Sequence, residues 1–141
     1  MGIHNISLRT IAAATEDEDR VKNALSLFLF DTEIEKETTE GYFGNPISIF
    51  NAWINGKNCN KFLELLKSKC CEKDLDQLKK ELDDRIDDYC NFHIRFDKQA
   101  AYNGTVRLAT TTDTISVRIK LKAYPARRDK ALEVAEKIFK G

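Results

Sequence analysis

The chain has 141 residues, of which 42% are apolar and 33% are charged, and its formal net charge is zero. This length fits one domain with a core of its own, and the apolar content is too high for a disordered chain. There is no apolar run long enough for a membrane helix, and the N-terminus lacks the basic start and apolar core of a signal peptide. We therefore expect a single domain over residues 1–141, intracellular and cytoplasmic.

The first predicted elements are a strand and a helix. Residues 3–14 are rich in β-forming residues and predict a strand. Thr15 and Glu18 have the spacing of a capping box, so we expect the following helix to have Thr15 as its N-cap. The apolar residues of this helix recur at helical spacing, as Val21, Ala24, Leu25 and Phe28.

The middle of the chain predicts a hairpin of strands and then a hairpin of helices. Residues 32–40 and 46–55 are typical of two strands, joined by a loop at 41–46 that contains two glycines. Two amphipathic helices follow, and we expect them to lie on the sheet. Their apolar positions are Phe62, Leu65, Leu66 and Cys70 in one helix, and Leu75, Leu78, Leu82 and Ile86 in the other.

From Tyr89 onward the apolar residues recur with a period of two, which predicts three strands near residues 91–97, 105–108 and 115–123. A last helix is predicted after Pro125. The expected order is β-α-β-β-α-α-β-β-β-α. This is an α+β fold, with a mainly antiparallel sheet and helices packed on one face.

Charge is distributed unevenly along the chain. Residues 1–90 carry 12 Lys or Arg and 18 Asp or Glu, whereas residues 91–141 carry 11 and 5. In the last three predicted strands the polar positions share one face. Such a face suits contact with the phosphates of RNA, and the competing interpretation is an ordinary solvated face. Its cationic residues are His93, Arg95, Arg107, Arg118, Lys120 and Lys122.

Several residues outside these strands are further candidates for RNA contact. Arg127 and Arg128 would extend the basic face at the start of the last helix, and Lys98 lies in a polar connection. Tyr42 and Tyr102 would stack on bases, although anchoring their loops to the core is the alternative. The connection at 97–104 is equally consistent with a structured turn in which Asp97 caps a short helical segment.

An enzyme is not indicated, and we predict no catalytic residue, metal site or cofactor. The chain lacks a phosphate-binding glycine loop, a nucleophile elbow and a zinc motif. We expect its four cysteines to be free thiols. They are Cys59, Cys70, Cys71 and Cys90.

Four blocks of sequence resemble an archaeal family of predicted RNA-binding proteins, also described as predicted exosome subunits. The resemblance implies an α+β fold similar to that of the ribosomal large-subunit protein that contacts the smallest ribosomal RNA, and an archaeal, cytoplasmic setting. It supplies no established catalytic residues. The blocks are residues 15–21, 41–47, 96–102 and 122–128.

The sequence thus predicts a non-catalytic RNA-binding module, an accessory factor in RNA processing or degradation. Its expected partners are RNA and RNA-processing proteins, with no membrane association. The alternative is a protein-interaction or assembly module that does not bind nucleic acid.

Overall fold

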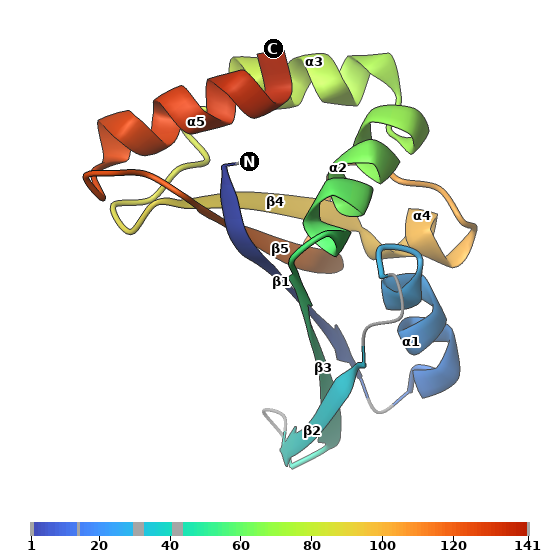
Figure 1. Ribbon diagram of the computed structural model, residues 1–141. Helices are drawn as coiled ribbons and strands as arrows, with labels where there is room; N and C mark the ends of the chain where they lie inside the picture. Colours follow the sequence, from blue (N-terminus) through green and yellow to red (C-terminus); the bar gives the residue numbers. More distant parts are fainter. Residues whose placement is uncertain (1, 14, 30–32, 41–43, 141) are drawn as a thin grey trace.

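The computed structural model describes residues 2–13, 15–29, 33–40 and 44–140 (Figure 1). Five strands form one antiparallel sheet in the order β2-β3-β1-β5-β4. They are β1 (Ile3–Ala12), β2 (Glu35–Glu40), β3 (Pro46–Asn55), β4 (Asn91–Asp97) and β5 (Thr114–Leu121). The helices are α1 (Glu18–Ser26), α2 (Asn58–Lys69), α3 (Glu72–Lys80), α4 (Lys98–Tyr102) and α5 (Arg128–Lys140).

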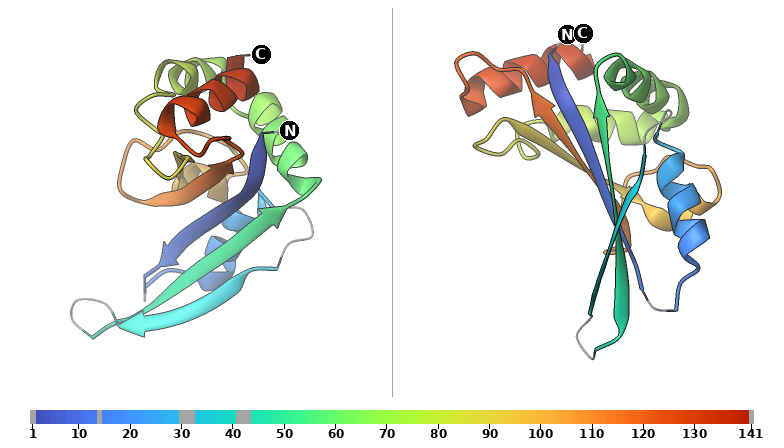
Figure 2. Two further views of the ribbon diagram at one scale, coloured as in Figure 1. Left: turned by 60° about the vertical axis from the view of Figure 1, so that its left-hand side comes forward. Right: turned by 60° about the horizontal axis from the view of Figure 1, so that its bottom comes forward.

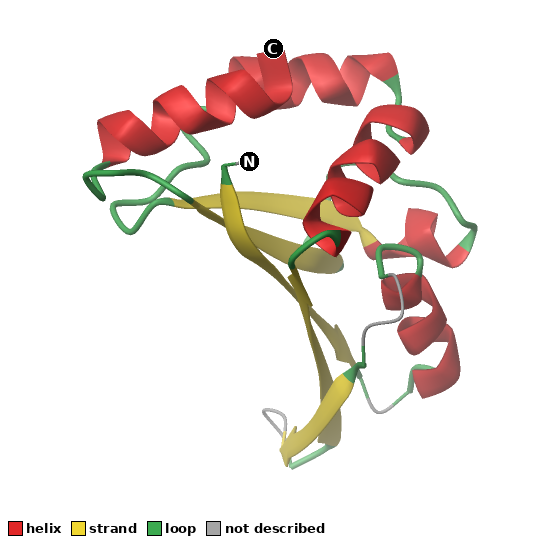
Figure 3. Ribbon diagram, viewed as in Figure 1, coloured by secondary structure: helices red, strands yellow, loops and turns green. Residues whose placement is uncertain are grey.

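The helices pack on one face of the sheet (Figure 3). In β1, β3, β4 and β5 one set of side chains is buried beneath the helices and the other points away from them, whereas β2 is exposed along its length. In β1, for example, Leu8 and Thr10 are buried, while Arg9 between them is exposed. Phe28 beside α1 stacks on Phe96 of β4, with ring centroids 4.9 Å apart, and this contact joins helix to sheet in the core. The predicted fold class is confirmed.

One predicted strand is replaced by a different structure. Between β4 and β5 the structure has α4, and residues 105–108 form only isolated bridges, from Val106 to Cys70 and from Leu108 to Phe96. Val106 and Leu108 are buried, so their alternation reflects packing against the core. The backbone of this segment runs beside the outer edge of β4, where Asp97 donates to the carbonyl of Arg107.

Two predicted helix ends differ from those in the structure. The N-cap of α1 is Asp17, whose carboxylate accepts a hydrogen bond from the amide of Asp19, so the predicted cap at Thr15 is wrong. Glu16 precedes the helix and accepts from the amide of Ala13. The second difference is the C-terminal end of α3, which stops at Lys80 and does not continue to residue 86.

Candidate nucleic-acid interface

The sheet face that points away from the helices, which we call the open face, is built from rows of paired residues. Directly opposed residues of antiparallel strands project to the same side. The central row joins four strands through the pairs of Ser7 with Trp53, Ser7 with Arg118, and Arg118 with His93. The two flanking rows contain Asn51, Arg9, Ser116 and Arg95 on one side, and Asn55, Asn5, Lys120 and Asn91 on the other.

These three rows are cationic. The twelve residues include three arginines, one lysine and His93, and none of the twelve is acidic. Acidic side chains border these rows. Glu35 of β2 pairs with Asn51 and so continues one flanking row, and Glu37 follows it in β2. Asp97 lies at the end of β4, and Asp87 contacts His93. Like charges on neighbouring strands repel, and a bound polyanion relieves that repulsion.

Trp53 gives the open face an aromatic surface that the sequence analysis did not place there. It is 42% exposed. It borders a shallow hollow of about 330 Å³ whose other polar walls include Arg9, His93 and Arg118. Trp53 alternates with the buried Ala52 and Ile54, so its outward direction follows from the sequence, but its position beside β1 and β5 does not.

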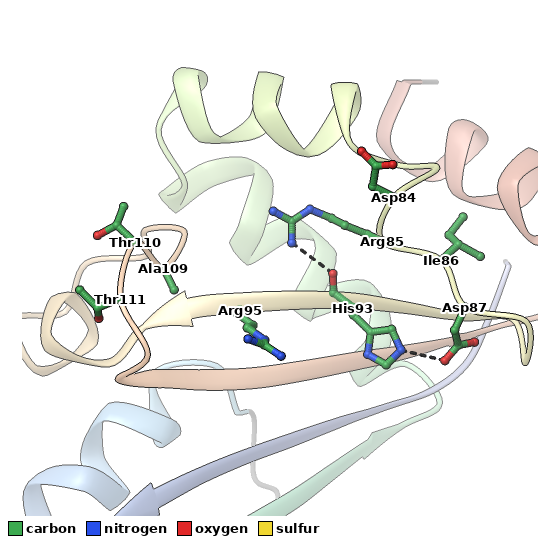
Figure 4. A pocket seen from close by; sticks show the side chains of 9 residues that line it. All are labelled: Asp84, Arg85, Ile86, Asp87, His93, Arg95, Ala109, Thr110 and Thr111. Atoms are coloured by element: carbon green, nitrogen blue, oxygen red, sulfur yellow. Dashed lines mark hydrogen bonds and ion pairs between the residues drawn. The ribbon is translucent and has the colours of Figure 1, made fainter.

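His93 connects the hollow to a second pocket at the edge of β4. This pocket has a volume of about 420 Å³, and Arg95, Thr110 and Thr111 also line it. Figure 4 shows His93 and Arg95 projecting from the same side of β4, with the imidazole directed at Asp87. The distance from Nε2 of His93 to Oδ2 of Asp87 is 2.8 Å. Asp87 thus orients the ring on the open face.

The pKa of Asp87 is held at about 2. Burial alone would raise this pKa, but hydrogen bonds from His93 and from the amides of Asn91 and Tyr89 outweigh it. The carboxylate is therefore ionised at neutral pH. It holds the loop before β4 in one conformation.

Five of the predicted RNA-contact residues are available at or near the open face. Arg95 and Arg118 are exposed on it, and Lys120 lies on it with its ammonium donating to the carbonyl of Tyr89 at 2.6 Å. Lys122 follows β5 and is exposed. Arg127 is exposed just before α5, with Asp129 3.4 Å from its Nε.

Lys98 and Tyr102 belong to a buried polar cluster instead. The side chain of Lys98 is 2% exposed, and its ammonium lies 2.9 Å from Glu16 and 2.8 Å from Asp113. The hydroxyl of Tyr102 donates to Glu16 at 2.7 Å, and the guanidinium of Arg20 stacks on its ring. These contacts anchor α4 to the start of α1. Of the two interpretations of this connection, the structured one is confirmed.

The cap of α4 agrees with that interpretation. Asp97 accepts a hydrogen bond of 3.0 Å from the amide of Gln99. Lys98 thus enters a short helix whose first residue is directed inward. A phosphate at the surface cannot reach its ammonium in this arrangement.

Arg107 and Arg128 also have structural partners. Arg107 lies off the sheet, so its predicted place on the basic face is wrong, and its Nε donates to Asp74 at 3.0 Å. Arg128 donates to the carbonyls of Ile86 and Asp83 and forms an ion pair with the Asp83 carboxylate at 2.7 Å. Tyr42 falls outside the described residues.

All four thiols are free, and three of them are buried. Cys59, Cys70 and Cys90 are buried and free. Burial raises the pKa of Cys59 and raises that of Cys70 to about 11, which keeps both protonated and weakly nucleophilic at neutral pH. Within the described ranges, no three His, Cys, Asp or Glu side chains gather in a way that would hold a metal ion. None of the described helices is long and apolar enough to cross a membrane.

Comparison with known proteins identifies a protein family that this chain matches. A family model described as RNA binding matches residues 5–121. The chain is 40% identical to "RNA-binding protein PAB1135" of Pyrococcus abyssi, covering 98% of this chain and 94% of that protein. It is 37% identical to an uncharacterised protein, MJ0213, of Methanocaldococcus jannaschii, covering 86% and 87% of the two chains.

Two solved structures have the same fold along almost the full chain. Protein AF2318 from Archaeglobus fulgidus superposes with a TM-score of 0.87 at 32% identity, covering 96% of this chain and 99% of that one. Mth689 from Methanothermobacter thermautotrophicus superposes with a TM-score of 0.82 at 34% identity, covering 99% of each chain.

Proposed function

This chain belongs to the RNA-binding family, and we propose that it binds RNA without catalysing a reaction, through the open face of its sheet. The observation that carries the proposal is the central row and its two flanking rows, in which cations from β1, β4 and β5 stand together and none of the twelve residues is acidic. The similarity to the Pyrococcus abyssi protein supports the same function.

The physical basis of the affinity is release of counterions. Each Lys or Arg that neutralises a phosphate frees a condensed cation, so binding weakens steeply as salt rises. Arg9 and Arg118 lie on neighbouring strands in adjacent rows, and Lys120 extends the positive surface along β5. Sheet geometry spaces such side chains by about 5 Å across strands and about 7 Å along one strand, so that several phosphates are met at once.

We further propose an accessory role in RNA processing or degradation, with RNA-processing proteins as partners. Four sequence blocks resemble a family of predicted exosome subunits, and this likeness is the support for the role.

A second candidate function, protein interaction or assembly, is favoured by one feature on the opposite side of the molecule. Leu63 of α2 and Val134 and Ile138 of α5 line a partly apolar groove of about 480 Å³. Lys67 and Lys137 border it. A protein partner at this groove and RNA on the open face do not compete for the same surface.

The test compares two triple variants that remove the same charge. One replaces open-face cations, as Arg9→Ser, Arg118→Ser and Lys120→Ser, and the control replaces exposed lysines of α3, as Lys73→Ser, Lys79→Ser and Lys80→Ser. Electrophoretic mobility shifts with structured RNA that carries loops are measured at two salt concentrations. We expect the open-face variant to lose the shift and the α3 variant to keep it. Equal shifts for both variants would refute the open face as the binding surface.

A further inference from the structure

We propose that the RNA bound by the open face is unpaired, with a base stacked on Trp53 and the strand continuing past Arg118 and Lys120 to the exposed Tyr89 and Tyr124. The inference rests on the proposed function, because it names the class of RNA that the same face takes. It is carried by the position of three exposed aromatic rings relative to the cations between them.

Trp53 is presented as a platform. It lies in β3, an inner strand of the sheet, yet it is 42% exposed. Its partner in β1 is Ser7, which is too small to cover the indole, and the residue beyond Ser7 in the row is Arg118. Because two strand spacings separate Trp53 from Arg118, their backbones lie about 10 Å apart. One nucleotide fits this arrangement, with its base on the indole and its phosphate towards the guanidinium.

The residues around Trp53 suit the edges of bases. Asn51 and Asn55 flank it on β3, Ser7 opposes it on β1, and Asn5 lies diagonally across, opposite Asn55. Amide and hydroxyl groups donate and accept hydrogen bonds, and unpaired bases expose their Watson–Crick edges to them. In a duplex these edges are paired and the base faces are stacked internally, so an indole on an open sheet has nothing to stack on.

Two more rings lie at the end of the sheet beyond Lys120. Tyr89 is 76% exposed and Tyr124 is 98% exposed. The loops that carry them lie side by side where β4 begins and β5 ends, as Figures 1 and 2 show. The amide of Leu121 donates to the carbonyl of Cys90 at 2.9 Å, and the thiol of Cys90 contacts the carbonyl of Arg127 at 3.7 Å.

Lys120 connects this end to the open face. Its ammonium donates to the carbonyl of Tyr89, so the charge is held between the central row and the two tyrosines. Exposed aromatic rings that alternate with cations are the recurring arrangement of single-strand binding surfaces, because bases stack on the rings while the cations follow the phosphates. Between Trp53 and the two tyrosines lie the cations Arg118 and Lys120, so this surface has both kinds of side chain.

A second copy of the chain is the competing occupant of the open face. A twofold contact would bring Arg9, Arg118 and Lys120 against the same residues of the partner. Opposed like charges disfavour such a contact, whereas a polyanion neutralises them. The charge of the face therefore favours RNA.

The test uses the fluorescence of Trp53, which is the only tryptophan of the chain. The full-length protein is titrated with a 12-nucleotide oligouridylate and, separately, with a blunt RNA duplex of the same length. We expect the oligouridylate to quench the fluorescence and to bind more tightly than the duplex. Since one stacked base contributes about 1–3 kcal/mol, Trp53→Ala should weaken oligouridylate binding by about five- to 150-fold, measured by anisotropy of labelled RNA. Trp53→Phe should retain most of the affinity, and Trp53→Ala should leave duplex affinity unchanged.

Three outcomes would overturn the proposal, and they differ from one another. In the first, oligouridylate binds in a salt-dependent way without quenching the fluorescence, and Trp53→Ala binds it as tightly as the wild type. This result would rule out the stacking site but leave RNA binding by the open face intact. No binding of either RNA would remove the proposed function as well. Self-association that Trp53→Ala abolishes, seen by light scattering without RNA, would show that the face joins two copies of the chain.

Discussion

The Nε of Arg107 lies 3.0 Å from Oδ2 of Asp74, and this contact joins the segment after α4 to α3. Asp74 is buried and accepts a second hydrogen bond, from the amide of Leu108. Burial alone would raise the pKa of Asp74, but the bonds from Leu108 and Arg107 outweigh it and lower the pKa. Arg107 is therefore neutralised by a carboxylate away from the open face. Arg107 therefore serves as a control for Arg118, which lies on the open face.

Arg118→Ser and Arg107→Ser should differ in their effect on RNA binding. The first removes a phosphate contact, so we expect the slope of log affinity against log salt to become shallower by about 0.7 for single-stranded RNA. The second should leave the slope unchanged. Anisotropy titrations at four salt concentrations measure both slopes. An equal change in the two variants would contradict the assignment of Arg118.

Asp74 should matter for stability rather than for binding. Asp74→Ala leaves the amide of Leu108 without its acceptor, and a buried donor without a partner costs about 1–3 kcal/mol. We expect the free energy of unfolding in urea to fall by about that amount. Asp76→Ala, at an exposed position of the same helix, is the control and should have little effect. RNA affinity should be the same in both.

Lys98 should likewise prove structural. Lys98→Met removes the ammonium from between Glu16 and Asp113 and leaves these two partly exposed carboxylates without their cation. Because these carboxylates are 27% and 40% exposed and keep other hydrogen bonds, we expect the free energy of unfolding to fall by about 1–3 kcal/mol, less than for a fully buried pair. Lys79→Met, on the exposed side of α3, is the matched control. If Lys98→Met unfolds like the wild type but binds RNA less well, Lys98 contacts RNA and its assignment to the buried polar cluster is wrong.

Asp87 should contribute to the loss of stability in acid. Its pKa is about 2 in the folded chain and about 4 in the unfolded one, so the unfolded chain binds more protons between these values. The contribution is fully present above about pH 4 and is lost as the pH falls towards 2. In Asp87→Asn, urea unfolding from pH 5 to pH 2 should show a smaller decline than in the wild type. An identical decline would show that the contact with His93 does not favour the ionised carboxylate.

The strands and the direction of their side chains could be predicted because alternation is local. Arg95, Arg118 and Lys120 were placed on a common face by this signal, and the structure has them there. Alternation of Val106 and Leu108 was misleading, since two buried residues in a short segment look the same whether they pair in a sheet or pack beside one.

Partners that are distant in sequence account for the remaining differences. Nothing local indicates that Lys98 is buried, because its acidic partners are Glu16 and Asp113, in other parts of the chain. Trp53 and Arg118 share one row of the sheet because β1 pairs with both β3 and β5, an order that sequence patterns do not reveal. The aromatic centre of the candidate site was therefore visible only in the folded structure.

The central claim is that RNA lies on the open face and not on the helical side. An NMR titration of the isotope-labelled chain of 141 residues with a 12-nucleotide oligouridylate tests it most directly. We predict that the amide shifts of the central row, the two flanking rows and the indole N–H of Trp53 change together, while those of α2, α3 and α5 stay in place. Shifts confined to these helices, with the Trp53 signal unmoved, would contradict the account.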